Sequence, residues 1–244
     1  MWRRSPAATL RTLDWGDGTV SLGRLTFRLE EARIDDSTEL VLYKPRSLVE
    51  QYAEMLAMRP GFRPQHVFEL GIFGGGSVAL WYEVFRPRKH VAIDVADRED
   101  TQAFTRWRQG REDRVSTYWR VDQADQAGLR RIASAEFSGQ LDLVVDDCSH
   151  LYAPTKASFE ALFPLLRPGG LYVIEDWAWA YLAEIREAFS GKRPLTDLVV
   201  HLVEATGTPS RVIASVAVYS RFVVVERGTG EIAAPALEDW IDRG

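Results

Sequence analysis

Short hydrophobic runs alternate with helix-length segments between residues 66 and 176. The runs are HVFEL, KHVAID, YWRVD, LDLVVD and LYVIED. Runs this continuous are typical of strands buried on both faces of a parallel sheet, with helices as the crossovers. After residue 195 a helical stretch leads to RVIASVAVY and SRFVVVERG, which follow one another too closely for a parallel crossover. The pattern predicts a Rossmann-like α/β fold: a mostly parallel seven-stranded sheet with helices on both faces and an antiparallel C-terminal hairpin.

The segments outside this pattern are short. Residues 1–45 contain two β-like runs, Thr19–Leu22 and Leu25–Leu29, which predict a hairpin closed near Gly23. A helix is expected from Ser47, its N-cap candidate, to about residue 58. We therefore expect an N-terminal accessory cap over residues 1–45, a core domain over 46–230 and a C-terminal tail over 231–244.

Composition narrows the function classes. The chain has 244 residues, of which 46% are hydrophobic, and this suits one buried α/β domain. Its net charge of −5, with both signs mixed along the chain, gives no basic stripe, so nucleic acid is not expected as a partner. No stretch approaches the roughly 18 apolar residues of a membrane span. Cys148 is the single cysteine, which excludes an internal disulfide and favours a reducing cytoplasm.

A glycine-rich turn follows the first predicted strand. In VFELGIFGGGS, Glu69 lies near the strand end and Gly71 opens a run of glycines that leads to a helix near Ser77. Glycines at such a turn let the backbone approach a ligand, and the helix N-terminus offers unpaired N–H groups. The second strand ends in Asp94, where a carboxylate can accept hydrogen bonds from ribose hydroxyls. These positions predict a nucleoside-binding site, although Asp94 as a simple cap of the next segment is the alternative.

Four carboxylates follow two neighbouring strands. LDLVVDD ends in Asp146 and Asp147, and LYVIED ends in Glu175 and Asp176. Because ligands bind at the carboxyl ends of parallel strands, we expect these acids to converge on one rim. Acids gathered in a partly buried site repel one another, and a divalent cation such as Mg²⁺ relieves that repulsion. Asp147, Glu175 and Asp176 are the predicted ligands, with Asp146 nearer the nucleoside; capping of helices or pairing with arginines is the alternative.

His150 lies in the loop after the first acid pair. Its ordinary pKa near neutrality suits a general base that takes a proton from a substrate hydroxyl. A structural histidine or a metal ligand is the alternative. Cys148 beside it is expected to be a small buried side chain rather than a nucleophile.

Three motifs together resemble a known family. They are ELGIFGGGS at 69–77, DDCSH at 146–150, and FPLLRPGG at 163–170 leading to YVIED at 172–176. In this combination they look like the macrocin and mycinamicin sugar O-methyltransferases and the related cephalosporin-hydroxylase group. The resemblance spans residues 45 to 227. Cys148 departs from the small residue common at its position, and the short N-terminal region does not look like the separate auxiliary domain of the longer relatives.

The resemblance implies a class I methyltransferase that transfers a methyl group from S-adenosylmethionine, with Mg²⁺ or another divalent cation, to a hydroxyl of a small natural-product acceptor such as a sugar. It implies Asp147, Glu175 and Asp176 as metal ligands and His150 as the base. The positions that it implies near the cofactor are Glu69, Gly71, Ser77, Asp94, Asp122 and Gln123, the last two at the end of the third strand beside the adenine.

Other function classes stay open on the sequence alone. One is a metal-independent methyltransferase that acts through His150. Another is a non-catalytic S-adenosylmethionine-binding partner in a biosynthetic complex. A third is an NAD-dependent oxidoreductase. That function gives no reason for two consecutive acid pairs, and the sequence lacks the G-x-G-x-x-G fingerprint that binds the dinucleotide phosphates. The acceptor's identity and the oligomeric state, including a homo-oligomer, are not determined by the sequence.

Overall fold

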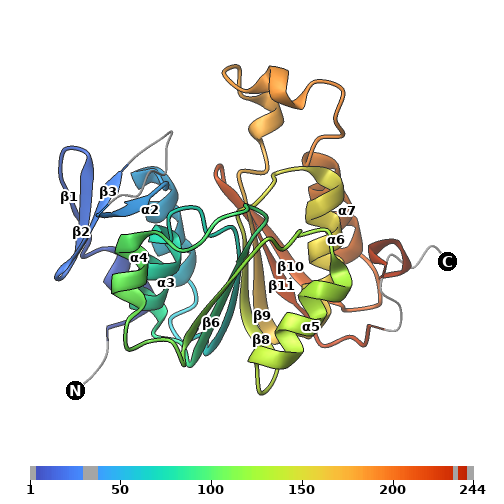
Figure 1. Cartoon of the computed structure of the whole chain (residues 1–244). Coiled ribbons are helices and arrows are strands. Elements are labelled where there is room, and N and C mark those ends of the chain that lie inside the picture. The colour runs from blue at the N-terminus through green and yellow to red at the C-terminus, as the bar shows by residue number, and fades with distance from the viewer. Residues whose placement is uncertain (1–3, 30–37, 233–235, 241–244) are drawn as a thin grey trace.

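The computed structural model describes residues 4–29, 38–232 and 236–240. Its centre is a seven-stranded sheet in the order β10-β11-β9-β8-β5-β6-β7 (Figure 1). The strands are β5 (His66–Leu70), β6 (Lys89–Asp94), β7 (Val115–Trp119), β8 (Leu141–Asp146), β9 (Leu166–Glu175), β10 (Ile213–Val218) and β11 (Phe222–Arg227). Strands β5 to β9 run parallel, whereas β11 pairs antiparallel with both β9 and β10. The predicted fold class is confirmed, including the hairpin at the sheet edge.

Helices cover both faces of this sheet, as Figure 1 shows. They are α2 (Arg46–Ala57), α3 (Gly76–Phe85), α4 (Gln102–Arg108), α5 (Gln126–Glu136), α6 (Tyr152–Leu162) and α7 (Thr196–Thr206). Successive residues of β8 point to opposite faces, so Leu143 and Val145 pack with α2, α3 and α4 while Val144 packs with α5, α6 and α7. Burial on both faces explains why the strand sequences lack an alternating polar pattern.

The N-terminal segment forms a second, smaller sheet. After α1 (Pro6–Leu10), β1 (Asp14–Trp15), β2 (Thr19–Leu22), β3 (Leu25–Leu29) and β4 (Leu40–Leu42) lie side by side in chain order. Strands β2 and β3 pair antiparallel, with Leu22 opposite Leu25, where the sequence predicts a hairpin. Val20 and Phe27 are fully buried and join the same core as α2 and α3. The cap is therefore packed on the central domain, and its status as a separate domain stays a prediction.

Two boundaries differ from the sequence prediction. Helix α2 begins at Arg46 behind Pro45, whose φ of −67° already suits a helix start, and not behind Ser47. The third strand is Val115–Trp119 and not YWRVD, because Arg120 takes a φ of 63° and ends it. In the C-terminal tail, η4 (Leu237–Trp240) buries its first and last side chains against the core.

Shorter 3-10 turns complete the architecture: η1 (Phe163–Leu165), η2 (Trp179–Tyr181) and η3 (Arg186–Phe189). The segment that carries η2 and η3 follows β9 and projects beyond the carboxyl ends of the strands (Figure 1). Among the described residues, no helix combines the length and apolar character needed to cross a membrane.

Candidate active site

Strands β8 and β9 bring the predicted acids together. The two strands are parallel neighbours with Asp146 opposite Ile174, so Asp147 and Glu175 leave adjacent strands at the same edge. Asp147 N donates to the carbonyl oxygen of Leu70 on β5, which fixes the start of the acidic loop against the first strand. The sheet register therefore accounts for the convergence predicted from the two acid pairs.

Asp147, His150 and Asp176 form the cluster that fits a metal ion. Each offers one ligand atom, and these atoms lie within 4.8 Å of one another. His150 Nε2 is 3.9 Å from Asp147 Oδ1. His150 and Asp176 both have φ near 54°, a left-handed conformation that is uncommon for side chains other than glycine and recurs at functional sites. The two carboxylate oxygens are ligands that suit Mg²⁺ or Mn²⁺, whereas an imidazole nitrogen is more typical of Zn²⁺ or Fe²⁺ sites.

Glu175 is placed differently from the other predicted ligands. Its side chain is buried, and Oε2 accepts a hydrogen bond from Lys44 Nζ at 2.6 Å while Oε1 accepts one from the Tyr52 hydroxyl at 2.7 Å. Lys44 Nζ also donates to Asp147 Oδ2 at 2.8 Å. Both oxygens of Glu175 are thus engaged by protein donors. Its role as a direct metal ligand stays a prediction, with this pairing as evidence against it.

Sequence reasoning missed Lys44 and Tyr52. Lys44 follows β4 of the N-terminal segment, and Tyr52 lies on α2. The only local signal is a lysine placed between the hydrophobic run LVLY and Pro45. Its partners are 103 and 131 residues away in the chain, so no local pattern could identify them.

The pKa shifts of the three acids reflect burial first and the neighbouring charges second. Burial raises the pKa of Glu175 to about 8, although Lys44 opposes the shift. Burial and the neighbouring Asp147 raise the pKa of Asp176. Burial would also raise the pKa of Asp147, but Lys44 and His150 hold it below its ordinary value. One lysine does not compensate three carboxylates, and an added cation would favour their ionised forms.

The glycine-rich loop that begins at Gly71 packs directly against the loop that begins at Asp147. Gly71 has a φ of 103°, and a Cβ at this position would overlap the carbonyl oxygen of Asp147. Helix α3 begins at Gly76, where a Cβ would overlap the carbonyl of Val41 in the N-terminal segment, and Ser77 is the next residue. Glycine is thus required at both points because other chain segments lie directly against the backbone.

Asp94 holds this loop from the end of β6. Its Oδ2 accepts hydrogen bonds from the backbone N–H groups of Ile72 and Phe73, both at 3.0 Å, and its Oδ1 accepts one from Ala96 at 2.9 Å. The carboxylate therefore shapes the loop that is predicted to bind the nucleoside. Its contact with ribose stays a prediction.

Glu69 is fully buried beneath the loop. Its Oε2 lies 2.9 Å from His90 Nε2 on the neighbouring strand, and its Oε1 has no hydrogen-bond partner among the described residues. The pair joins β5 to β6 just before the glycine turn. This position supports the loop from below, and a direct cofactor contact by Glu69 stays a prediction.

Asp146 and Gln123 face a buried polar network. Asp146 Oδ2 accepts hydrogen bonds from the hydroxyls of Tyr172 at 2.8 Å and Ser158 at 2.7 Å, and Gln123 Nε2 donates to Asp146 Oδ1 at 3.0 Å. Burial raises the pKa of Asp146 to about 6. Asp122 is exposed, and its carboxylate accepts from a nearby backbone N–H group. The cofactor contacts predicted for these three residues remain predictions.

Cys148 is not an activated nucleophile. It lies between the acid pair and His150, and burial, together with the surrounding carboxylates, raises the pKa of its thiol. The thiolate, which would be the reactive form, is thereby disfavoured.

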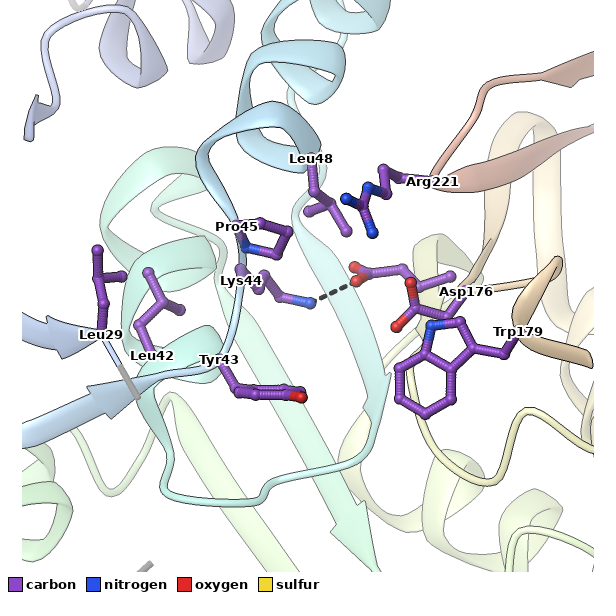
Figure 2. Close-up of a pocket in the computed structure, with 10 residues that line it drawn as sticks. Leu29, Leu42, Tyr43, Lys44, Pro45, Leu48, Asp176, Trp179 and Arg221 are labelled. Carbon is purple, nitrogen blue, oxygen red and sulfur yellow. Dashed lines mark hydrogen bonds and ion pairs between the residues drawn. The ribbon is translucent and has the colours of Figure 1, made fainter. Parts of the chain in front are cut away.

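A cavity of about 470 Å³ opens beside the acids (Figure 2). Its walls come from the N-terminal segment and the start of α2 on one side and from the segment after β9 on the other. Trp179 projects into it and packs on His150, with ring centroids 4.1 Å apart. The residues that line it are Leu29, Leu42, Tyr43, Lys44, Pro45, Leu48, Glu175, Asp176, Trp179 and Arg221. Its apolar walls and acidic floor suit a small molecule whose polar group meets the carboxylates.

Comparison with known sequences gives matches across this region. Residues 68–177 match a family described as a methyltransferase domain. The chain is 31% identical over 200 residues to the demethylmacrocin O-methyltransferase of Streptomyces fradiae and to the mycinamicin VI 2''-O-methyltransferase of Micromonospora griseorubida. Each match covers 72% of this chain and 47% of the relative. The chain thus spans about half the length of these curated relatives.

A shorter match is closer in sequence. The 8-demethyl-8-alpha-L-rhamnosyl tetracenomycin-C 2'-O-methyltransferase of Streptomyces olivaceus is 40% identical over 116 residues, which cover 48% of this chain and 28% of that protein. Among solved structures, the MycE methyltransferase in complex with Mg, SAH and mycinamycin VI aligns with a TM-score of 0.57 and 30% identity. The alignment covers 76% of this chain and 50% of that one.

Proposed function

Residues 68–177 match a methyltransferase domain, and the chain has the class I fold of the related macrocin and mycinamicin sugar O-methyltransferases. On that premise we propose that the protein is a metal-dependent O-methyltransferase. The methyl donor is S-adenosylmethionine. The acceptor is a hydroxyl of a small natural product, with a sugar as the first candidate. We also expect the protein to act in a reducing cytoplasm, which its single cysteine supports.

The observation that carries this proposal is the cluster of Asp147, His150 and Asp176, in which we assign the two carboxylates to the metal ion and the His150 imidazole to the base. Their ligand atoms converge to within 4.8 Å at the carboxyl ends of β8 and β9. The glycine turn at Gly71 lies directly against the Asp147 backbone. A donor bound at that turn would therefore have its reactive end close to a hydroxyl held at the cluster.

The cofactor site that we propose uses the loop from Gly71 to Gly75 and the N-terminus of α3. Asp94 fixes the loop through backbone N–H groups. The free N–H groups at the start of α3 suit the carboxylate of an amino-acid moiety. The related MycE structure, by its description, holds SAH and Mg.

In the proposed reaction the cluster holds and deprotonates the acceptor. Asp147 and Asp176 would bind the divalent cation, which as a Lewis acid lowers the pKa of a coordinated hydroxyl. His150 accepts the hydroxyl proton at a ring nitrogen, and Trp179 packed on its ring limits the access of water. The acceptor oxygen takes the methyl group, the carbon–sulfur bond breaks, and S-adenosylhomocysteine leaves.

The test combines binding with transfer. Calorimetry should show that the protein binds S-adenosylhomocysteine, and radiolabelled S-adenosylmethionine should report transfer to a panel of glycosylated polyketides that includes mycinamicin VI. Excess EDTA should abolish transfer and Mg²⁺ should restore it. Asp176→Asn should remove metal binding while keeping S-adenosylhomocysteine binding. Asp113→Asn is the matched control because this aspartate is 78% exposed.

Metal-independent transfer is the second candidate. The observation in its favour is Lys44, whose ammonium group already neutralises part of the acid cluster. Full activity in EDTA, with the Asp176→Asn variant unaffected, would establish this alternative and refute the metal step.

A further inference from the structure

Lys44 is a buried cation that pairs with two of the predicted metal-site acids, Asp147 and Glu175. Its side chain is 1% exposed, and its Nζ lies 2.8 Å from Asp147 Oδ2 and 2.6 Å from Glu175 Oε2. Figure 2 shows its side chain extending from the N-terminal segment toward the carboxylates on the opposite side of the pocket. A lysine carries a positive charge at neutral pH, and both of its carboxylate partners lie within hydrogen-bond distance of the ammonium group. A buried lysine persists only when it is paired in this way.

Asp147 is shared between Lys44 and the proposed metal site. Its Oδ2 accepts from the ammonium group, while its Oδ1 faces His150. A divalent cation at the cluster of Asp147, His150 and Asp176 would thus lie next to a second positive charge. The ammonium group and the metal ion would both be attracted to the Asp147 carboxylate, and as two positive charges they would repel one another.

From this geometry we propose that Lys44 is a counter-ion of Asp147 and Glu175 that competes with a divalent cation for their negative charge. It stabilises the carboxylates by its own positive charge and thereby weakens the binding of a divalent cation. This inference rests on the proposed function, since it assumes that the cluster binds a cation. It makes Lys44 a positioning residue of the proposed metal site.

A thermodynamic cycle connects the two effects. A group that stabilises the metal-free protein more than the metal-bound protein must lower metal affinity by the same free energy. Removal of the Lys44 charge should therefore destabilise the protein in EDTA and tighten metal binding. A purely structural lysine would give the first effect without the second.

Tyr52 supplies the matched control. Its hydroxyl donates to Glu175 Oε1 at 2.7 Å and is as deeply buried as Lys44, but it carries no charge. Tyr52→Phe removes one hydrogen bond from the same carboxylate and leaves the ion pairs intact. Any change in metal affinity that depends on charge should be absent from this variant.

The experiment uses Mn²⁺ as the probe, titrated by electron paramagnetic resonance into the full chain saturated with S-adenosylhomocysteine. We expect Lys44→Met to bind Mn²⁺ at least about tenfold more tightly than the unmodified protein, because a like charge beside the ion is gone. Tyr52→Phe should change the affinity by less than about threefold, since it alters no charge. Thermal unfolding in EDTA and in Mn²⁺ should show a larger stabilisation by the metal in Lys44→Met.

Each result separates this inference from the proposed function. Equal or weaker Mn²⁺ binding by Lys44→Met, with S-adenosylhomocysteine binding intact, would overturn the counter-ion role even if the unmodified protein binds Mn²⁺. Binding of Mn²⁺ by Lys44→Met alone would support the inference and refute metal dependence of the unmodified protein. Lys44→Gln serves as the second variant. Failure of both variants to fold, with or without Mn²⁺, would show that the lysine is purely structural.

Discussion

The contact between Gly71 and the Asp147 backbone gives the sharpest test of how the two loops are coupled. In Gly71→Ala the new Cβ would overlap the Asp147 carbonyl oxygen and lie 3.1 Å from its carbonyl carbon, at a φ of 103°. A non-glycine residue in such a conformation costs roughly 1–3 kcal/mol. Forcing a tightly packed site apart adds about 1–3 kcal/mol. We therefore expect Gly71→Ala to lower the free energy of unfolding by roughly 2–6 kcal/mol.

Gly110→Ala is the matched control for backbone strain alone. Gly110 has a φ of 74°, but a Cβ there would meet nothing within 4 Å. Its cost should be limited to about 1–2 kcal/mol. Urea unfolding measures both variants, and calorimetry measures their affinity for S-adenosylhomocysteine. Because relief of the Gly71 overlap must move the acidic loop, only Gly71→Ala should also weaken Mn²⁺ binding. Equal stabilities of the two variants, with unchanged ligand binding in both, would refute this reasoning.

Three further substitutions test separate contacts. Asp94→Asn should weaken S-adenosylhomocysteine binding by about tenfold in calorimetry, because a neutral amide accepts the loop N–H groups less strongly than a carboxylate; wild-type affinity would contradict this. Tyr172→Phe should lower the free energy of unfolding by about 1–3 kcal/mol in urea, since it deprives the buried Asp146 of a donor at 2.8 Å; an unchanged midpoint would argue against the network. His150→Gln should reduce transfer by roughly 10²–10⁴-fold at constant S-adenosylhomocysteine affinity. An unchanged pH profile of turnover in that variant would exclude His150 as the base.

The sequence was sufficient for the sheet and for the convergence of the acids. Continuous hydrophobic runs indicate buried parallel strands, and the geometry of parallel strands then places Asp147 and Asp176 on one rim. The end of the third strand was misplaced because a positive φ at Arg120, and not the hydrophobic pattern, terminates it. Strand boundaries of this kind depend on backbone conformation, which composition does not encode locally.

The contacts of Lys44 could not have been predicted from the sequence. They connect a residue before the core domain with Asp147 and Glu175, at sequence separations of 103 and 131. Only tertiary packing decides which buried carboxylate meets which cation. The same limit applies to Asp146 and Gln123, whose side chains the structure places in a hydrogen-bonded network. A strand-end acid is recognisable from sequence, but the direction of its side chain is not.

The N-terminal segment forms one wall of the candidate active site, because Leu29, Leu42, Tyr43 and Lys44 line the cavity. The Val41 backbone lies against Gly76 at the start of α3, so β4 fixes the position of the helix end that is proposed to bind the cofactor. Three residues later Lys44 enters the acid cluster, and Pro45 then starts α2. The backbone from β4 to Pro45 therefore positions Lys44, the start of α2 and one wall of the cavity. Because Lys44 and the cavity wall share this support, a displacement of β4 would alter the proposed metal binding and the proposed acceptor binding together. Divergence of this segment among related proteins would then change both properties without any substitution in the Asp147 or Asp176 loops.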